Sequence, residues 1–205
     1  MKYLARITGI AAILGLTACT TAIQVDADSS YQPQYNAETR ELGKLKVDNL
    51  TPAPLQYYRV ARLNAAPEKV FALVANHANV GDWIPGIDSV SDVNHSKSMT
   101  PGKPNKGTTR TIVDATGQAL TEDITYWEKD VGYSYSIQET PAAPLTKHLG
   151  VIQIESDGNG GSLLTYRQYF EAKDSIKGKL TPFIMKILLN KALGNLTDEF
   201  GGELL

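Results

Sequence analysis

The sequence predicts an α+β fold in which a curved antiparallel sheet packs against one long C-terminal helix. Residues 87–171 alternate apolar and polar side chains in short runs separated by Gly- and Pro-containing turns, which is typical of antiparallel strands. A strand pattern and two short helical patterns precede these runs. A longer helical pattern over 181–200 closes the chain. Strands grouped together and followed by one helix indicate an α+β arrangement rather than alternating βαβ units.

The predicted elements follow in order. A first strand is expected over Leu55–Leu63, and Pro67 suits the first turn of a helix that ends near Asn76. A second short helix or turn is expected over 79–83. Thr181 and Pro182 are expected to cap and begin the last helix. The six remaining strands are predicted over 87–95, 108–114, 119–129, 132–139, 149–155 and 163–171.

The first half of the last helix is apolar on nearly every side. Met185 and Leu189 belong to an apolar stripe at helical spacing, and Phe183, Ile184, Ile187 and Leu188 add apolar side chains on other sides of the same half. A helix that is apolar all round needs cover on more than one side. We therefore expect this half to lie deep against the sheet or to border an internal cavity.

Length and composition limit the possible functions. The chain has 205 residues, which suits one domain plus a targeting segment. Its formal net charge is -2 and no segment is strongly basic, so we expect no nucleic-acid partner. The chain has three histidines, far apart, and one cysteine. No zinc-like ligand spacing can be built from them, and we expect neither a metal nor a cofactor.

The N-terminus has the pattern of a bacterial lipoprotein precursor. Lys2 and Arg6 precede an uncharged run over 7–16, which is too short to span a bilayer but fits a signal-peptide core. The run closes with Leu16-Thr17-Ala18-Cys19, which resembles the lipobox of bacterial lipoproteins. Small residues fit beside the bond that is cut, and only a thiol can form the thioether to diacylglycerol. An ordinary signal peptide with an incidental cysteine is the alternative.

Three segments follow from this reading. Residues 1–18 are the expected signal peptide, 19–50 a polar tether lipidated on Cys19, and 51–205 the folded domain. Residues 38–47 of the tether could form a helical turn or an added strand. Thr20, rather than Asp, follows the cysteine and resembles the pattern of outer-membrane lipoproteins. We therefore expect a cell-envelope protein, held by its lipid in the outer membrane and facing the periplasm.

Two segments carry a resemblance to a known family. Residues 64–74, with the sequence Asn-Ala-Ala-Pro-Glu-Lys-Val-Phe-Ala-Leu-Val, and 83–90, beginning Trp-Ile-Pro-Gly-Ile, resemble the START/SRPBCC superfamily. The similarity is strongest to its polyketide cyclase/dehydrase and lipid-transport branch and covers about 55–200. It implies the helix-grip fold, with two short helices after the first strand and a sheet wrapped around the C-terminal helix. It also implies a cavity between sheet and helix, although function varies widely within the superfamily.

Strand alternation suggests what lines that cavity. The expected lining is apolar, with several phenols and one carboxylate, and suits an amphipathic or aromatic guest. A core filled by side chains is the alternative. The ligand-binding residues that we expect are Trp83, Glu122, Tyr126, Tyr133, Tyr135, Tyr166 and Ile187.

Two titratable residues have competing interpretations. Glu122 is either an acid/base or ligand anchor, or the partner of Arg110 on the neighbouring strand. His148 is either a proton shuttle or, as the pattern favours, a surface-loop histidine.

The leading function from sequence is a module that binds or carries a hydrophobic small molecule or lipid. The alternative is a cyclase-, dehydrase- or hydrolase-type enzyme that uses Glu122, a tyrosine or His148. A third possibility is an envelope interaction protein with a filled core. The chain has no Gly-x-Ser-x-Gly motif and no phosphate-binding glycine loop, and we assign no catalytic residue.

Overall fold

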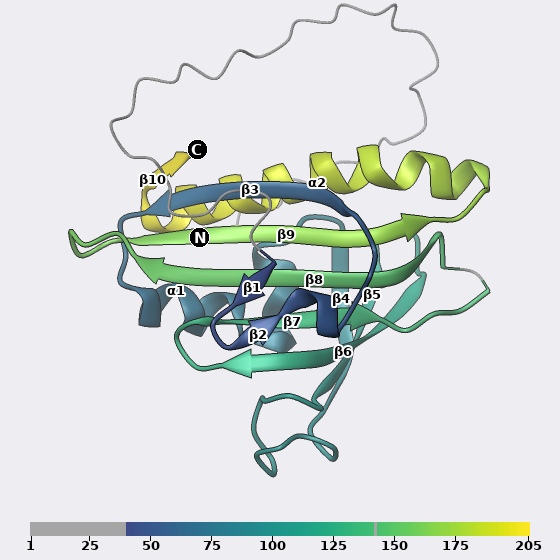
Figure 1. Ribbon diagram of the computed structural model, residues 1–205, viewed down its shortest axis with the longest axis horizontal. Coiled ribbons are helices and arrows are strands. Elements are labelled where there is room, and N and C mark those ends of the chain that lie inside the picture. Colours follow the sequence, from purple (N-terminus) through teal and green to yellow (C-terminus); the bar gives the residue numbers. More distant parts are fainter. Residues whose placement is uncertain (1–39, 142) are drawn as a thin grey trace, which may run out of the picture. The chain divides into compact units, whose positions relative to one another are not determined.

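The structure is a computed structural model that describes residues 40–141 and 143–205 (Figure 1). The expected signal peptide, Cys19 and the tether up to residue 39 lie outside the described residues.

One large antiparallel sheet forms the body of the domain. Its eight strands lie in the order β10-β3-β9-β8-β7-β6-β5-β4. Two short helices follow β3, and a long helix, α2, lies along the part of the sheet that contains β3 and β9 (Figure 1). This arrangement confirms the predicted α+β, helix-grip fold. The sheet strands are β3 (Leu55–Leu63), β4 (Ile87–Asn94), β5 (Thr109–Asp114), β6 (Ala119–Glu128), β7 (Gly132–Ile137), β8 (Leu145–Ser156), β9 (Ser162–Ala172) and β10 (Gly202–Leu204).

Four helical elements accompany the sheet within the described residues. Two are α-helices, α1 (Pro67–Val74) and α2 (Ile176–Phe200), and two are 3-10 helices, η1 (Val47–Asn49) and η2 (His77–Asp82). Pro67 occupies the first turn of α1, as expected, since its missing N–H would have no helical partner there. None of the helices in the described ranges combines the length and apolar content needed to cross a bilayer.

A tight turn joins the two longest strands of the sheet. The Asp157 carboxylate accepts hydrogen bonds from the backbone N–H groups of Asn159 and Gly161, at 2.7 and 2.9 Å. Gly158 and Gly160 adopt positive φ angles of 79° and 88°, which glycine tolerates without a side-chain clash. The turn sets the register of β8 against β9, and these strands carry many of the inward-facing side chains.

The segment before β3 is part of the packed structure. β1 (Glu41–Leu42) and β2 (Leu45–Lys46) form a hairpin, and η1 follows it directly. Leu42 and Val47 are fully buried in a cluster with Leu149, Val151 and Tyr169. This second apolar cluster is separate from the main core. Residues 40–50 therefore pack on the sheet, whereas the sequence suggested a tether up to residue 50.

The last helix begins six residues earlier than expected, at Ile176 instead of Pro182. Ser175 is its N-cap and accepts a hydrogen bond from the backbone N–H of Gly178 at 3.0 Å. Thr181 and Pro182 lie inside the helix, so their expected capping role is wrong. The Thr181 hydroxyl instead donates to the carbonyl oxygen of Lys177, one turn back.

Within residues 40–141 and 143–205, one side of the helix is covered and the other is exposed. Leu189, Leu193 and Leu196 are buried against the sheet. On the first half, Phe183 is 65% exposed and Ile187 is 51% exposed, so the expectation that this half is covered on more than one side is wrong. The reason is geometric: the buried face includes Leu189, and the apolar residues of the opposite face meet no other element of the described residues.

Candidate functional site

The interior between the sheet and α2 is rich in aromatic rings. Trp83, Tyr133, Tyr135 and Tyr166 lie in the main core, each at most 4% exposed. They come from the segment after η2 and from β7 and β9, and α2 covers them with Leu189 and neighbouring residues. The structure thus brings four of the expected ligand-binding residues together. Their role in binding stays a prediction.

Glu122 forms a buried ion pair with Arg110. The two residues face each other on β6 and β5, and Arg110 Nε donates to Glu122 Oε2 at 2.5 Å. Their side chains are 1% and 5% exposed. Burial opposes the charge of Arg110, but the carboxylate of Glu122 and the nearby tyrosines raise the pKa of the guanidinium above its ordinary value. The interpretation of Glu122 as the cross-strand partner of Arg110 is confirmed.

His77 extends this pair into the core. Arg110 Nη1 donates to His77 Nδ1 at 3.2 Å, which leaves the ring proton on Nε2. Burial, aided by the positive charge of Arg110, lowers the pKa of His77 to about 3, so the ring is neutral. Its Nε2 has no hydrogen-bond partner among the described residues. No sequence pattern indicated this role, since no other histidine or cysteine lies near His77 in the chain.

A second hydrogen-bonded chain crosses the sheet. The backbone N–H of Ile137 donates to His148 Nδ1 at 3.1 Å, and His148 Nε2 lies 2.6 Å from Gln168 Oε1. Gln168 Nε2 donates to the Tyr135 hydroxyl at 2.8 Å, which lies 2.5 Å from the Tyr166 hydroxyl. The bond from Ile137 fixes the imidazole proton on Nε2, so the chain runs from β7 to the core.

His148 is buried rather than exposed on a loop. β8 begins at Leu145, four residues before the expected start, and this places His148 inside the strand. Burial lowers its pKa to about 4, and the hydrogen bond to Gln168 opposes that shift. The surface-loop interpretation of His148 is therefore wrong. A strand irregularity between Thr146 and Leu149 explains why simple alternation did not place this residue.

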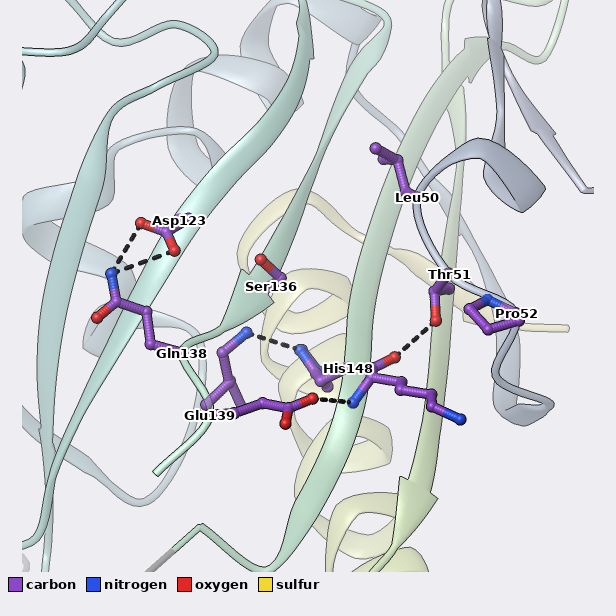
Figure 2. Close-up of a pocket in the computed structure, with 10 residues that line it drawn as sticks. Leu50, Thr51, Pro52, Asp123, Ser136, Gln138, Glu139 and His148 are labelled. Carbon is purple, nitrogen blue, oxygen red and sulfur yellow. Dashed lines mark hydrogen bonds between the residues drawn. The ribbon is translucent and has the colours of Figure 1, made fainter. Parts of the chain in front are cut away.

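A pocket of about 440 Å³ lies where β7 and β8 separate (Figure 2). The two strands pair only from Gly132 to Tyr135 on β7, so a gap opens beyond Tyr135. The segment Leu50–Pro52 lies beside this gap, with Thr51 Oγ1 bonded to the carbonyl oxygen of Lys147 at 2.7 Å. The lining residues are Leu50, Thr51, Pro52, Asp123, Ser136, Ile137, Gln138, Glu139, Lys147 and His148.

This pocket, which both polar and apolar residues line, is not the expected cavity between the sheet and α2. His148, one of its buried lining residues, is linked to the interior through Gln168, and both of its ring nitrogens already have protein partners. Sequence alternation could not indicate the pocket, because it arises where two paired strands diverge.

Two expected ligand-binding residues lie elsewhere. A β-bulge between Ile124 and Tyr126 shifts the alternation of β6 by one residue. Tyr126 therefore packs with the Leu42 cluster, and its hydroxyl donates to Glu128 Oε2 at 2.5 Å. Trp127 takes the inward position and contacts Phe71, with ring centroids 5.0 Å apart. The inward orientation expected for Tyr126 is wrong, and Ile187 lies on the exposed face of α2.

The interior contains a further donor without an acceptor. Trp83 is 2% exposed, and its indole Nε1 has no hydrogen-bond partner among the described residues. Its ring lies 6.1 Å from that of Tyr166, and its carbonyl accepts a bond from Asn195 of α2 at 3.0 Å. A buried N–H without an acceptor costs about 1–3 kcal/mol. Such a donor marks a position where the acceptor atom of a guest would be stabilised.

Within 40–141 and 143–205, no three His, Cys, Asp or Glu side chains gather in a way that could hold a metal ion.

Comparisons with known proteins agree with the fold. The model of the family described as polyketide cyclase / dehydrase and lipid transport matches residues 55–201. No curated protein matches the chain significantly. Among solved structures, the protein XoxI from Bacillus cereus has a TM-score of 0.57 at 19% identity, over 70% of this chain and 94% of that chain. A protein from Nitrosospira multiformis has a TM-score of 0.55 at 15% identity, over 72% and 96%. At these identities the structures support the fold alone.

Proposed function

The chain belongs to the polyketide cyclase / dehydrase and lipid transport family, and from this premise we propose that it binds a hydrophobic small molecule or lipid between the sheet and α2. We further propose that it does so in the cell envelope, anchored through a lipid on Cys19. Since the family description covers both catalysis and transport, the choice between them depends on the site.

The unpaired indole N–H of Trp83 carries the proposal. It lies in an aromatic interior beside Tyr166 and beneath α2. A guest with an apolar body and one carbonyl or hydroxyl oxygen would bury its body among the rings and accept this hydrogen bond. Orienting a mostly apolar ligand with a few polar groups is typical of small-molecule sites.

Entry of a guest requires a movement of α2. The core side chains beneath the second half of the helix are in mutual contact, and Asn190 and Asn195 bond to Tyr57 and Trp83. The first half has a largely exposed apolar face and few fully buried residues. We therefore place the point of entry at the first half, beside the Gly86 turn that Leu188 approaches.

The enzymatic alternative has less support. Glu122 is held by Arg110, and His148 is held by Ile137 and Gln168. Each of these two residues would have to leave its partners before it could transfer a proton to a substrate. Binding requires neither to react, so the binding role fits the observed contacts better.

The test compares two tryptophan variants by fluorescent-lipid titration and thermal melts. Trp83→Phe keeps an aromatic ring but removes the unpaired N–H. We expect uptake to weaken about two- to tenfold, the equivalent of one net hydrogen bond, with no greater loss of thermal stability than in the control variant, since both substitutions remove the same ring volume. Trp127→Phe is the matched control, because the Trp127 nitrogen is not among the buried unpaired atoms of the described residues. If the wild type shows no saturable uptake over a broad panel of lipids and aromatic compounds, the binding role is wrong.

The anchoring part of the proposal is tested separately. Leu16-Thr17-Ala18-Cys19 supports it, and the thiol of Cys19 is the expected site of lipidation. In cells fed a labelled fatty acid, Cys19→Ala should abolish labelling of the protein, and the precursor should stay uncut or the protein leave the membrane fraction. Continued labelling of the variant would contradict the lipid anchor.

A further inference from the structure

The first half of α2 has an apolar stripe on the side facing away from the core. It consists of Ile176, Leu180, Phe183, Ile184 and Ile187, which are between 48% and 82% exposed. Their spacing of four, three, one and three residues places them along one face of an α-helix. The stripe holds five of the seven large hydrophobic side chains exposed within the described residues. A gathering of this kind indicates a contact surface.

Lysines border the stripe on both sides. At 100° per residue, Lys177 lies at one border, beside Ile184, and Lys179 and Lys186 lie along the other. All three are exposed, and no acidic residue occurs in α2 before Asp198. Asp174, just before the helix, pairs with Lys179 at 2.9 Å. An apolar face bordered by lysines is the pattern of a helix that lies in a membrane interface.

We propose that this stripe docks on the surface of a phospholipid bilayer that carries anionic headgroups. Phe183, Ile184 and Ile187 would enter the boundary between headgroups and acyl chains, while the lysines contact lipid phosphates. The opposite face of α2 stays on the protein core through Leu189 and Leu193. The helix would therefore lie in the plane of the interface.

Charge favours a bilayer over a second copy of the chain. Two stripes packed face to face would bring the Lys177, Lys179 and Lys186 borders of both copies together, and like charges in close contact are destabilising. An anionic bilayer has the complementary charge. Five apolar side chains and three lysines thus fit the same occupant.

The lipid anchor proposed on Cys19 would keep the stripe close to the bilayer. Twenty-one peptide steps separate Cys19 from Arg40, so the chain between them spans at most about 75 Å. A lipid on Cys19 would hold the domain within that distance of the bilayer and raise the effective concentration of the stripe there. This gain in local concentration rests on the lipid anchor of the proposed function, whereas the contact of the stripe with lipid does not, so the two are tested separately.

The experiment uses the chain from Thr20 onward, which lacks the signal peptide and Cys19 but keeps every described residue. Sedimentation with vesicles of phosphatidylcholine, with and without phosphatidylglycerol, measures partitioning. We expect the wild type to bind the vesicles that contain phosphatidylglycerol and to dissociate at high salt. Phe183→Gln with Ile187→Gln should weaken binding at least about tenfold, with an unchanged melting temperature because both side chains are exposed.

Two further variants sharpen the result. Met99→Gln is the matched control, since Met99 is 73% exposed and belongs to the loop between β4 and β5 rather than to α2. It should leave vesicle binding unchanged. Lys177→Gln with Lys186→Gln should reduce the preference for phosphatidylglycerol and the dependence on salt.

Three results would overturn the inference. They are a wild type that does not sediment with either vesicle, a Phe183/Ile187 variant that binds as well as the wild type, and a wild-type dimer, seen without vesicles, that this variant dissociates. Uptake of a soluble fluorescent lipid is measured on the same proteins. Vesicle binding without such uptake supports the docking surface and refutes the proposed guest site. Uptake without vesicle binding supports the guest site and refutes the docking surface.

Discussion

At the scale of single residues, the pair of Arg110 and Glu122 is the main electrostatic feature of the interior. Both side chains are buried, and Arg110 also lies over the ring of Tyr135, 5.1 Å from its centre. Removing two charges from water costs several kcal/mol per ion, and only close pairing with further contacts offsets that cost. The pair therefore fixes the alignment of β5 and β6 and holds His77, rather than adding much net stability.

Glu122→Gln should be strongly destabilising. It leaves the buried guanidinium of Arg110 without a counter-charge, which we expect to lower the free energy of unfolding by about 3–5 kcal/mol. Chemical denaturation measures the loss. The control is the double variant Arg110→Met with Glu122→Leu, which removes both charges and should recover most of the stability. A double variant as unstable as the single one would show that the charges themselves are needed.

His148 should make stability fall as the solution becomes acidic. Burial lowers its pKa from 6.5 to about 4, so the folded protein binds the proton less tightly than the unfolded chain. Its contribution is complete above pH 6.5 and is lost progressively as the pH falls towards 4. At pH 5 the loss amounts to about 2 kcal/mol.

The test is His148→Gln, measured by denaturation at pH 7 and pH 5. We expect the difference in unfolding free energy between the two pH values to be smaller in the variant than in the wild type by about 2 kcal/mol. His77 also has a lowered pKa, but it is present in both proteins and cancels in the comparison. The same pH dependence in both would contradict a buried, neutral His148.

At the scale of elements, the sequence predicted which helices and strands exist, and in what order, better than which side chains of a strand face the core. β3 begins and ends at the predicted residues, because Tyr57, Val60 and Leu63 follow a clear pattern between proline and helix. The bulge in β6 is different: it inserts one residue before Tyr126, and nothing in the local sequence marks it. Pairing on both sides of a strand decides such a shift. The inward orientation was therefore predicted correctly for Tyr133, Tyr135 and Tyr166 but not for Tyr126, and ligand binding by these residues stays a prediction.

The start of α2 shows how two signals compete. Thr181-Pro182 is a good helix-start pattern, but Ser175 stands earlier and its side chain caps the backbone N–H of Gly178. A proline in the second turn loses one hydrogen bond, and the helix extends through it all the same.

Ser175→Ala should therefore loosen the first turn of α2. We expect a loss of about 1 kcal/mol, seen as faster amide hydrogen exchange in 178–181, with little change in the melting temperature because this end of the helix is exposed. Thr181→Ala is the matched control and should have a smaller effect on exchange, since its hydroxyl bonds a carbonyl within the helix. A larger effect from Thr181 than from Ser175 would restore the cap suggested by the sequence.

At the scale of the whole molecule, contacts between distant segments set the limit of prediction. The hydrogen-bonded chain from His148 to Tyr166 joins β7, β8 and β9, and the Trp83 N–H lacks an acceptor among the described residues because of how the segment after η2 packs against them. No local sequence pattern indicates either feature. β10 was not predicted either, because its three residues become a strand only by pairing with β3 at the edge of the sheet. Local periodicity was enough to predict the architecture, while the hydrogen bonds of the interior could be identified only in the assembled sheet.

The N-terminal boundary of the domain follows from the same kind of contact. Leu42 and Val47 are fully buried, but the polar residues around them hide this in the sequence. A chain that starts at Arg40 should unfold in one cooperative transition. A chain that starts at Thr51 loses both side chains and exposes the Leu149 and Tyr169 surface beneath them. At about 1.5–3 kcal/mol for each buried side chain, we expect a loss of about 3–6 kcal/mol, a large part of the stability of a typical domain.

Urea denaturation of the two chains measures this difference, with Leu42→Ala in the longer chain as a milder variant that should lose about 2–5 kcal/mol. The shorter chain should also have the lower midpoint and, because apolar surface is uncovered, the greater tendency to aggregate. Equal midpoints for the two chains would mean that the hairpin of β1 and β2 rests on the sheet without stabilising it, and the domain boundary would return to residue 51. A lower midpoint for the shorter chain would show that the hairpin is part of the folding unit. Any lipid tether from Cys19 would then end before Arg40 rather than at residue 50.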